Sequence, residues 1–365
     1  MKKLPSQNTK QRSSNLELFR IITMLLIVAH HYVINSDIFQ SVLEGNRFSA
    51  ANIFLVLLGA WGKTGINCFV LITGYFMCKS KITASKYFKL LFEVMFYKIT
   101  IFVIFFFAGL ETISLTSLLN TFFPTTTVAS GFTDCFLIFY LLIPFANILI
   151  SQLTKHSHLT LIAILLFAYT FMATVPWFSV KLNYISWFFV LYLIASFVQL
   201  HPCEKFNNNK IWGPVMICSI LLSVASVIAI FLYGDKVKII SGDTPYYFLS
   251  DSNKPFALLV AFSAFMFFRN MRIPYVKLVN TIGATTYGVL LIHSNSDTMR
   301  NWLWNTVLKN NSYYGTSSIY AHAIISVLLV FTVCSFIDFL RIKFIEPPAM
   351  KLFNKFMAAR ASKKQ

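Results

Sequence analysis

The feature that most limits the fold of this chain is a series of apolar runs, most of them long enough to cross a lipid bilayer as a helix. The hydrocarbon core offers no hydrogen-bond partners to the backbone, so spanning segments must be helical or form a closed barrel. We therefore predict an all-α, polytopic membrane protein, a bundle of about ten transmembrane helices. The runs lie near 16–34, 64–78 (after an apolar stretch from about 51), 91–110, 132–150, 159–175, 184–200, 211–233, 255–269, 278–294 and 319–341.

The composition excludes a soluble fold and argues against a nucleic-acid partner. Hydrophobic residues make up 57% of the 365 residues and charged residues only 12%, whereas soluble domains are about 45–50% apolar and about 25% charged. The net charge of +18 comes from Lys and Arg residues that cluster at helix ends and in the tails. That distribution is typical of the positive-inside pattern of membrane proteins rather than of a basic face that binds nucleic acid.

The same charges predict the orientation and the domain limits. With the N-terminus in the cytoplasm, most of the 31 Lys and Arg residues fall in inner segments, which fits an even number of helices with both termini cytoplasmic. We expect a cytoplasmic N-terminal tail at 1–14, a transmembrane domain at 15–345 and a basic cytoplasmic tail at 346–365. No cleavable signal peptide is expected. The six scattered cysteines are expected to be small core residues, and no metal spacing is visible.

The first run carries the densest set of polar groups, namely Glu17, Arg20, His30 and His31. Eleven residues separate Arg20 from His31, so the two side chains share one helix face about 16 Å apart along the axis. An Arg at the inner mouth can hold the phosphate of a cytoplasmic donor, and a His in the outer half can act as a general base. The alternative is that Arg20 snorkels to the interface and both histidines satisfy buried carbonyls.

The ninth run carries His293 near its outer end, at a depth that should be similar to that of His31. Two histidines at one level can line one cavity. The alternative is an ordinary histidine at the membrane interface.

Polar groups in the second and third runs leave further alternatives open. Asn67 and Thr73 need partners inside the second run, and they can serve either helix packing or a site. Lys98 lies five residues after Glu93 in the third run, and it either pairs with Glu93 or faces a cavity. The basic stretch 79–89, which ends at Lys89, is a topology signal that also stands where an anionic donor would enter.

At these residues the chain resembles the membrane acyltransferase-3 family, and within it the bacterial surface-polysaccharide O-acyltransferases. Arg20, followed by ten residues and then His31, matches the signature of that family. The segment 65–76, with Thr73-Gly74-Tyr75, resembles a second motif, and the segments 132–147 and 283–293 resemble two later ones. The resemblance covers nearly the whole chain in order.

The resemblance implies that an acyl group passes from cytoplasmic acyl-CoA, acetyl-CoA in particular, to a hydroxyl of a surface polysaccharide or its lipid-linked precursor. Position by position, it implies that His31 is the catalytic histidine and that Arg20 helps to position the donor. Where many members have Arg-x-x-Arg after the second span, this chain has Lys86 and Lys89, which keeps the charge but loses a bidentate phosphate grip.

We therefore predict a membrane O-acyltransferase of the bacterial plasma membrane, in contact with acyl-CoA, a glycan acceptor and lipid, and using no metal. The predicted catalytic residues are His31, Arg20 and His293, of which His293 assists or orients the acceptor. The candidates for substrate binding are Glu17, Asn67, Thr73, Tyr75 and Lys89. One alternative is a transporter or flippase of sugar precursors, against which the missing internal repeats weigh mildly. The other is a membrane sensor or scaffold without turnover.

Overall fold

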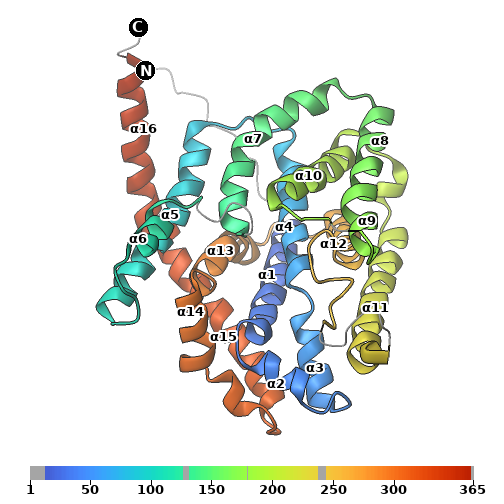
Figure 1. The fold of residues 1–365 in the computed structure, drawn as a ribbon. Helices are drawn as coiled ribbons and strands as arrows, with labels where there is room; N and C mark the ends of the chain where they lie inside the picture. Colours follow the sequence, from blue (N-terminus) through green and yellow to red (C-terminus); the bar gives the residue numbers. More distant parts are fainter. Residues whose placement is uncertain (1–12, 126–130, 179, 237–243, 363–365) are drawn as a thin grey trace.

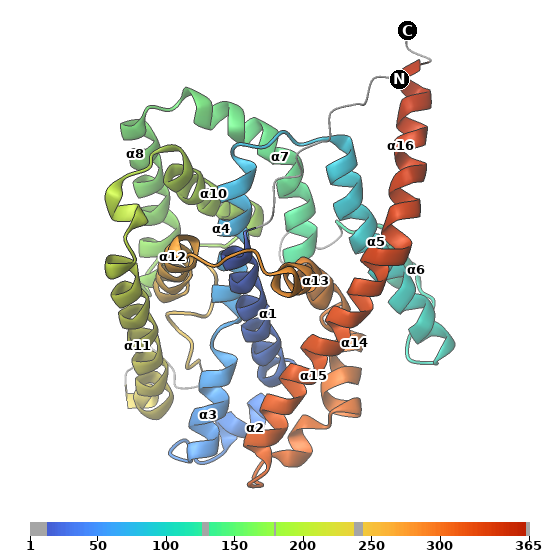
Figure 2. The ribbon, with the colours of Figure 1, turned by 180° about the vertical axis from the view of Figure 1, so that it is seen from behind.

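The computed structural model describes residues 13–125, 131–178, 180–236 and 244–362, and every regular element in them is helical (Figures 1 and 2). Almost all of the expected tail at 1–14 lies outside the described residues. The expected tail at 346–365 begins with a helix, α16 (Glu346–Ser362), that continues from α15 (Ile319–Leu340) through a π-helical turn. The remaining α-helices are α1 (Ser14–Ile34), α2 (Ile38–Glu44), α3 (Ala50–Gly59), α4 (Gly62–Met77), α5 (Ala84–Phe107), α6 (Leu115–Phe122), α7 (Phe132–Gln152), α8 (Lys155–Leu166), α9 (Met172–Thr174), α10 (Tyr184–Leu200), α11 (Asn209–Tyr233), α12 (Pro255–Asn270), α13 (Lys277–His293) and α14 (Asp297–Asn301).

Each apolar run read from the sequence corresponds to a helix. In the described part of the chain, seven helical stretches are long and apolar enough to cross a membrane. The second run is divided into α3 and α4 by a short break after Gly59. The runs at 184–200, 255–269 and 278–294 correspond to α10, α12 and α13, which have only 16 or 17 residues. A total of about ten spans, with both termini in the cytoplasm, therefore stays a prediction.

Helix α1 lies at the centre of the bundle, where it contacts α3, α4, α13 and α15 (Figure 1). Its first turns contribute Leu16 and Phe19 to an apolar cluster with α4, α7, α10 and α12. Its second half contributes Met24 and Val28 to another cluster with α3, α5, α13 and α15. Because α1 belongs to both clusters, the polar side chains that it carries are held in fixed positions by packing on several sides.

The outer surface of the bundle is apolar over several helices. Phe145 of α7 is 68% exposed, Leu221 of α11 is 61% exposed and Ile325 of α15 is 62% exposed. A soluble monomer rarely exposes contiguous apolar surface of this extent. The exposed surface thus agrees with the apolar runs in indicating that lipid surrounds this chain.

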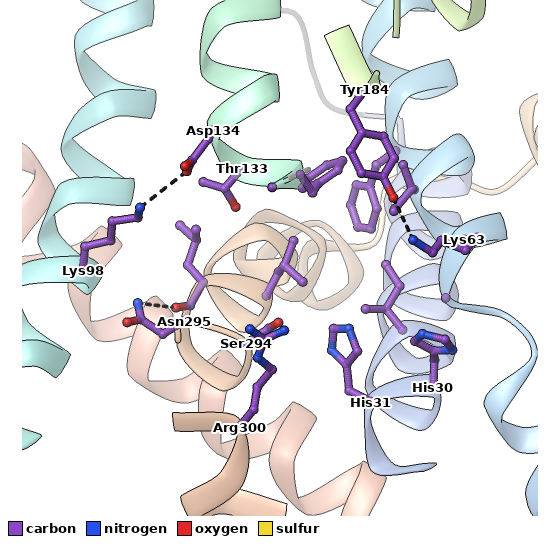
Figure 3. Close-up of a pocket in the computed structure, with 18 residues that line it drawn as sticks. His30, His31, Lys63, Lys98, Thr133, Asp134, Tyr184, Ser294, Asn295 and Arg300 are labelled. Atoms are coloured by element: carbon purple, nitrogen blue, oxygen red, sulfur yellow. Dashed lines mark hydrogen bonds and ion pairs between the residues drawn. The ribbon is translucent and has the colours of Figure 1, made fainter. Parts of the chain in front are cut away.

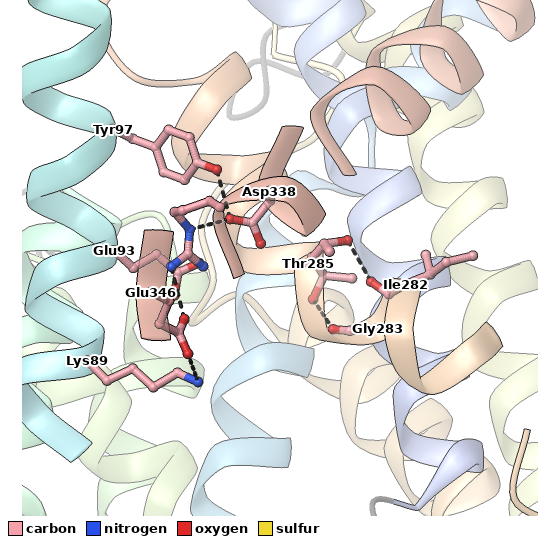
Figure 4. Close-up of polar contacts among 10 residues, drawn as sticks. Lys89, Glu93, Tyr97, Ile282, Gly283, Thr285, Asp338 and Glu346 are labelled. Atoms are coloured by element: carbon pink, nitrogen blue, oxygen red, sulfur yellow. Dashed lines mark hydrogen bonds and ion pairs between the residues drawn. The ribbon is translucent and has the colours of Figure 1, made fainter. Parts of the chain in front are cut away.

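A buried ionic cluster joins α5 to α15 and α16 (Figure 4). The guanidinium of Arg341, which is 2% exposed, contacts a carboxylate oxygen of Asp338 at 2.7 Å, of Glu93 at 2.9 Å and of Glu346 at 3.0 Å. Lys89 forms an ion pair with Glu346 at 2.5 Å. One arginine therefore holds three carboxylates, and Glu93 pairs with Arg341 rather than with Lys98.

We predict that Arg341→Met destabilises the protein by about 3–5 kcal/mol, because removing one partner leaves buried carboxylates without a counter-charge. The measurement is unfolding of the purified chain in detergent. Lys343→Met is the matched control, since Lys343 is an exposed cation two residues away, and it should change stability by less than about 0.5 kcal/mol. Equal effects of the two variants would contradict a structural role for the cluster.

Candidate active site

A cavity of about 340 Å³ opens where several helix ends meet (Figure 3). The last turn of α1 and the residues after α13 meet the first turns of α4, α7 and α10 there, with α5 and α14 on one side. In the predicted orientation all of these ends lie toward the outer face. The polar side chains that line the cavity are His30, His31, Lys63, Lys98, Thr133, Asp134, Tyr184, Ser294, Asn295 and Arg300.

Two of the sequence-predicted residues, His31 and His293, are brought into contact. Nδ1 of His31 lies 2.9 Å from Nε2 of His293, and Nδ1 of His293 lies 2.6 Å from the carbonyl oxygen of Val289. His31 lines the cavity, whereas the side chain of His293 is 0% exposed and stands behind it. The expected common depth of the two histidines is therefore found, with one of them at the cavity and the other supporting it.

The contact to Val289 determines which nitrogens carry protons when both rings are neutral. A carbonyl oxygen can only accept, so Nδ1 of His293 must donate to Val289, and Nε2 of His293 is then an acceptor. Nδ1 of His31 must therefore donate to His293. This leaves Nε2 of His31 unprotonated, which is the state that a general base requires.

His30 was not among the predicted site residues, yet its ring also lines the cavity. Its Nδ1 lies 2.5 Å from the carbonyl oxygen of Gly59, so this histidine does satisfy a buried carbonyl, as one alternative expected. Gly62 stands directly against the ring, and a Cβ there would clash with it. The glycine at the start of α4 thus makes room for His30 at the cavity wall.

Cations at the cavity lie beside carboxylates or a phenol (Figure 3). Nζ of Lys63 donates to the hydroxyl of Tyr184 at 2.9 Å and lies 3.4 Å from a carboxylate oxygen of Asp251. Nζ of Lys98 lies 3.4 Å from a carboxylate oxygen of Asp134. Of the two alternatives for Lys98, the cavity-facing one is therefore confirmed.

Two of these residues are positive charges that the sequence analysis used only to predict the orientation in the membrane. Lys63 and Arg300 belong to the segments that the charge count places outside, and they were counted only for orientation. Tyr184 and Asp134 begin helices, and nothing in their local sequence separates them from ordinary helix starts.

Arg20 and Glu17 lie at the other end of α1, outside the lining of this cavity. Nη1 of Arg20 donates to Oε1 of Glu17 at 2.7 Å. Glu17 packs against Gly283 of α13, where an added Cβ would come within 2.7 Å of the Glu17 Cβ. α1 and α13 thus approach closely at this end, and a role of Arg20 in donor binding stays a prediction.

The other candidates for substrate binding also lie outside the cavity lining. The buried amide of Asn67 accepts from the indole of Trp187 at 2.9 Å and donates to the Ser252 carbonyl at 2.7 Å. The hydroxyl of Thr73 donates to the carbonyl of Phe69 in its own helix at 2.9 Å. The ring of Tyr75 faces the guanidinium of Arg269 at 5.7 Å, and Lys89 belongs to the Arg341 cluster. Their part in substrate binding stays a prediction.

Comparison with known proteins gives one kind of match. A family model described as an acyltransferase domain, that of the acyltransferase-3 family, matches residues 13–338. No curated protein and no solved structure matches the chain. The matched residues include both histidines and the whole lining of the cavity.

The contacts of Asn67 predict a structural role that can be measured. Asn67→Leu should lower the free energy of unfolding by about 1–3 kcal/mol for each partner left unsatisfied, because Trp187 and Ser252 are both buried. Thr73→Val is the control in the same helix, since its hydroxyl bonds only to its own backbone. Thermal unfolding in detergent distinguishes the two, and an unchanged midpoint for Asn67→Leu would argue against this role.

Proposed function

Because this chain belongs to the acyltransferase-3 family, we propose that it is a membrane O-acyltransferase that moves an acyl group, acetyl in the first instance, from acyl-CoA to a sugar hydroxyl. The acceptor is a surface polysaccharide or its lipid-linked precursor, and the membrane is a bacterial plasma membrane. The observation that carries the proposal is the contact from His31 through His293 to the Val289 carbonyl. It supports a catalytic base that faces a polar cavity.

In the proposed reaction, the sugar hydroxyl enters the cavity and transfers its proton to Nε2 of His31. The oxygen attacks the thioester carbonyl carbon, so that a C–O bond forms and the C–S bond breaks. The proton then passes from His31 to the sulfur of the leaving CoA. His293 stabilises the intermediate imidazolium by accepting from Nδ1 of His31, which is the role of the third residue in a catalytic triad.

Negative charge develops on the carbonyl oxygen during this step, and hydrogen-bond donors at the cavity can stabilise it. The hydroxyl of Tyr184 accepts from Lys63, so its own proton is available to another acceptor. Since the neighbouring ammonium makes the phenol a stronger donor, we assign Tyr184 and Lys63 to the oxyanion.

The donor is proposed to bind from the inner side, with Arg20 near its phosphates. Its thioester must then reach His31, about 16 Å away along α1. The long pantetheine arm suits this geometry. The pair of Arg20 with Glu17 keeps the guanidinium in place at the inner end of the helix.

The first test of this function concerns the two histidines. His31→Ala should reduce the turnover number for acetyl transfer by about 10²–10⁴-fold, the usual contribution of a general base. His293→Phe should reduce it by about 10², near the lower end of that range, because the base remains but loses its acceptor. The measurement is transfer of labelled acetyl from acetyl-CoA to extracted surface glycan, using purified protein.

His158→Gln is the matched control for the loss of a buried histidine. His158 is also buried and bonds to a backbone carbonyl, that of Leu193 at 3.0 Å, but it does not line the cavity. Unchanged ester content in cells that carry His31→Ala at matched expression would exclude the mechanism. A glycan that is missing from the surface, rather than present without acetyl groups, would favour the transporter alternative.

A second test concerns the oxyanion. Tyr184→Phe should lower the turnover number by about 10²–10³-fold, with a smaller change in KM, because the lost hydrogen bond strengthens only in the transition state. Tyr247→Phe serves as the control, since its hydroxyl donates to the Thr174 carbonyl at 2.9 Å outside the cavity lining. A Tyr184→Phe variant that changes KM alone would assign this hydroxyl to substrate binding instead.

A further inference from the structure

A second chamber of about 330 Å³ adjoins the histidine cavity. The two share three lining residues, Lys98, Asn295 and Arg300, which Figure 3 shows at the side of the cavity away from Lys63 and Tyr184. The chamber lies between α5, α6 and the start of α14, which are neighbours in both overall views (Figures 1 and 2). A ligand seated there stands next to the space that His31 faces.

The walls of this chamber differ in chemistry. On the α5 side, Phe102 and Phe105 present aromatic surface, and Phe105 packs edge-on against Trp302 at 5.4 Å between ring centroids. Other residues of the lining carry hydroxyl, amide and carboxylate groups, among them Thr298 and Glu111. A chamber that combines aromatic surface with several hydrogen-bonding groups fits a ligand that is apolar on one face and rich in hydroxyls at its edge. A pyranose ring has this form.

The charges favour a neutral ligand over an anionic one. The described lining of the chamber holds two cations, Lys98 and Arg300, and two carboxylates, Glu111 and Asp297. Arg300 forms an ion pair with Asp297, and Lys98 forms one with Asp134. An anionic ligand would have to compete with these carboxylates, whereas hydroxyl groups can bond to the remaining donor and acceptor positions without separating any pair.

The carboxylate of Glu111 is oriented by a hydrogen bond and has acceptor sites left for such a ligand. Oε2 accepts a hydrogen bond of 2.6 Å from the hydroxyl of Thr298, which fixes the orientation of the group. Ionised carboxylates have about four acceptor sites, so the remaining sites can receive sugar hydroxyls. These bonds to a charged acceptor are among the stronger ones that a neutral ligand can form.

We propose that this chamber binds a neutral sugar unit of the acceptor and presents its hydroxyl to His31. The role of this sugar as the acyl acceptor rests on the proposed acyltransferase function. Binding of the sugar to the chamber can be measured without turnover. It names the substrate class as a neutral saccharide rather than one that carries a carboxylate or a phosphate.

The test measures sugar binding to the full chain in detergent by saturation-transfer NMR. The probes are methyl β-D-glucopyranoside and methyl β-D-glucuronide, which differ by a carboxylate. We expect saturation transfer to the glucoside to be about fivefold or more stronger than to the glucuronide, because the carboxylate of the glucuronide would compete with the paired carboxylates of the chamber. Asn120→Trp places a bulky ring on the α6 wall of the chamber and should abolish the glucoside signal.

Leu119→Trp is the matched control, because Leu119 is the adjacent exposed residue of α6 and does not line the chamber. Its signal should equal that of the unmodified protein. Glu111→Gln is a milder second variant, which keeps the shape and should weaken glucoside binding by about threefold to tenfold, the difference between a charged and a neutral acceptor. Thermal unfolding of each variant verifies that the fold is intact.

The outcomes separate the chamber from the reaction. Failure of the unmodified protein to bind the glucoside, equal or stronger binding of the glucuronide, or unchanged binding by Asn120→Trp would overturn the assignment of the chamber. If binding follows the expected pattern but no acetyl transfer is detected, the assignment of the chamber as a sugar site is supported and the proposed function is contradicted. If acetyl transfer depends on His31 but glucoside binding is unaffected by Asn120→Trp, the proposed function is supported and the assignment of the chamber as a sugar site is overturned.

Discussion

A polar side chain inside this bundle can be satisfied only by partners within the protein or its cavities, because surrounding lipid cannot supply one. Some polar residues of the apolar runs, such as Thr73, bond to their own helix, but several others form contacts between helices. Asn67 joins α4 to Trp187 of α10, and Arg341, in the π-helical turn after α15, joins that turn to α5. The link between His31 and His293 joins α1 to α13 in the same way. The bonds that stabilise the bundle and the bond that orients the proposed base are therefore of the same kind.

The sequence predicts the helices well because their apolar runs are long, and the period of the helix places Arg20 and His31 on one face. It also predicts the common depth of His31 and His293, since both residues lie near the outer ends of runs that point the same way. What it cannot predict is which helix ends converge. Tyr184 and Asp134 both line the cavity because α10 packs against α4 and α7, and that packing depends on side-chain fit between segments far apart in the chain.

The third run shows how a local pattern leaves a real ambiguity. Glu93 and Lys98 are five residues apart, which places them about 140° apart around the helix and so on different faces. The structure uses the two faces separately. Glu93 meets Arg341 in the ionic cluster, and Lys98 meets Asp134 at the cavity. The angle alone argues against a pair, but the partner of each residue comes from another helix and is visible only in the fold.

An imidazole behind His31, in place of the carboxylate of other triads, avoids the free-energy cost of burying a charge. In a triad of the usual kind, a carboxylate accepts from the base and favours its protonated form. A carboxylate at position 293 would be an ion without exposure, and burying a charge inside a lipid-embedded bundle costs several kcal/mol unless a counter-ion is buried with it. The neutral ring of His293 accepts the same hydrogen bond without that cost, and the Val289 carbonyl sets its tautomer. This arrangement orients His31 but stabilises an imidazolium less than a carboxylate does, so the proposed reaction depends more on the hydrogen-bond donors assigned to the oxyanion.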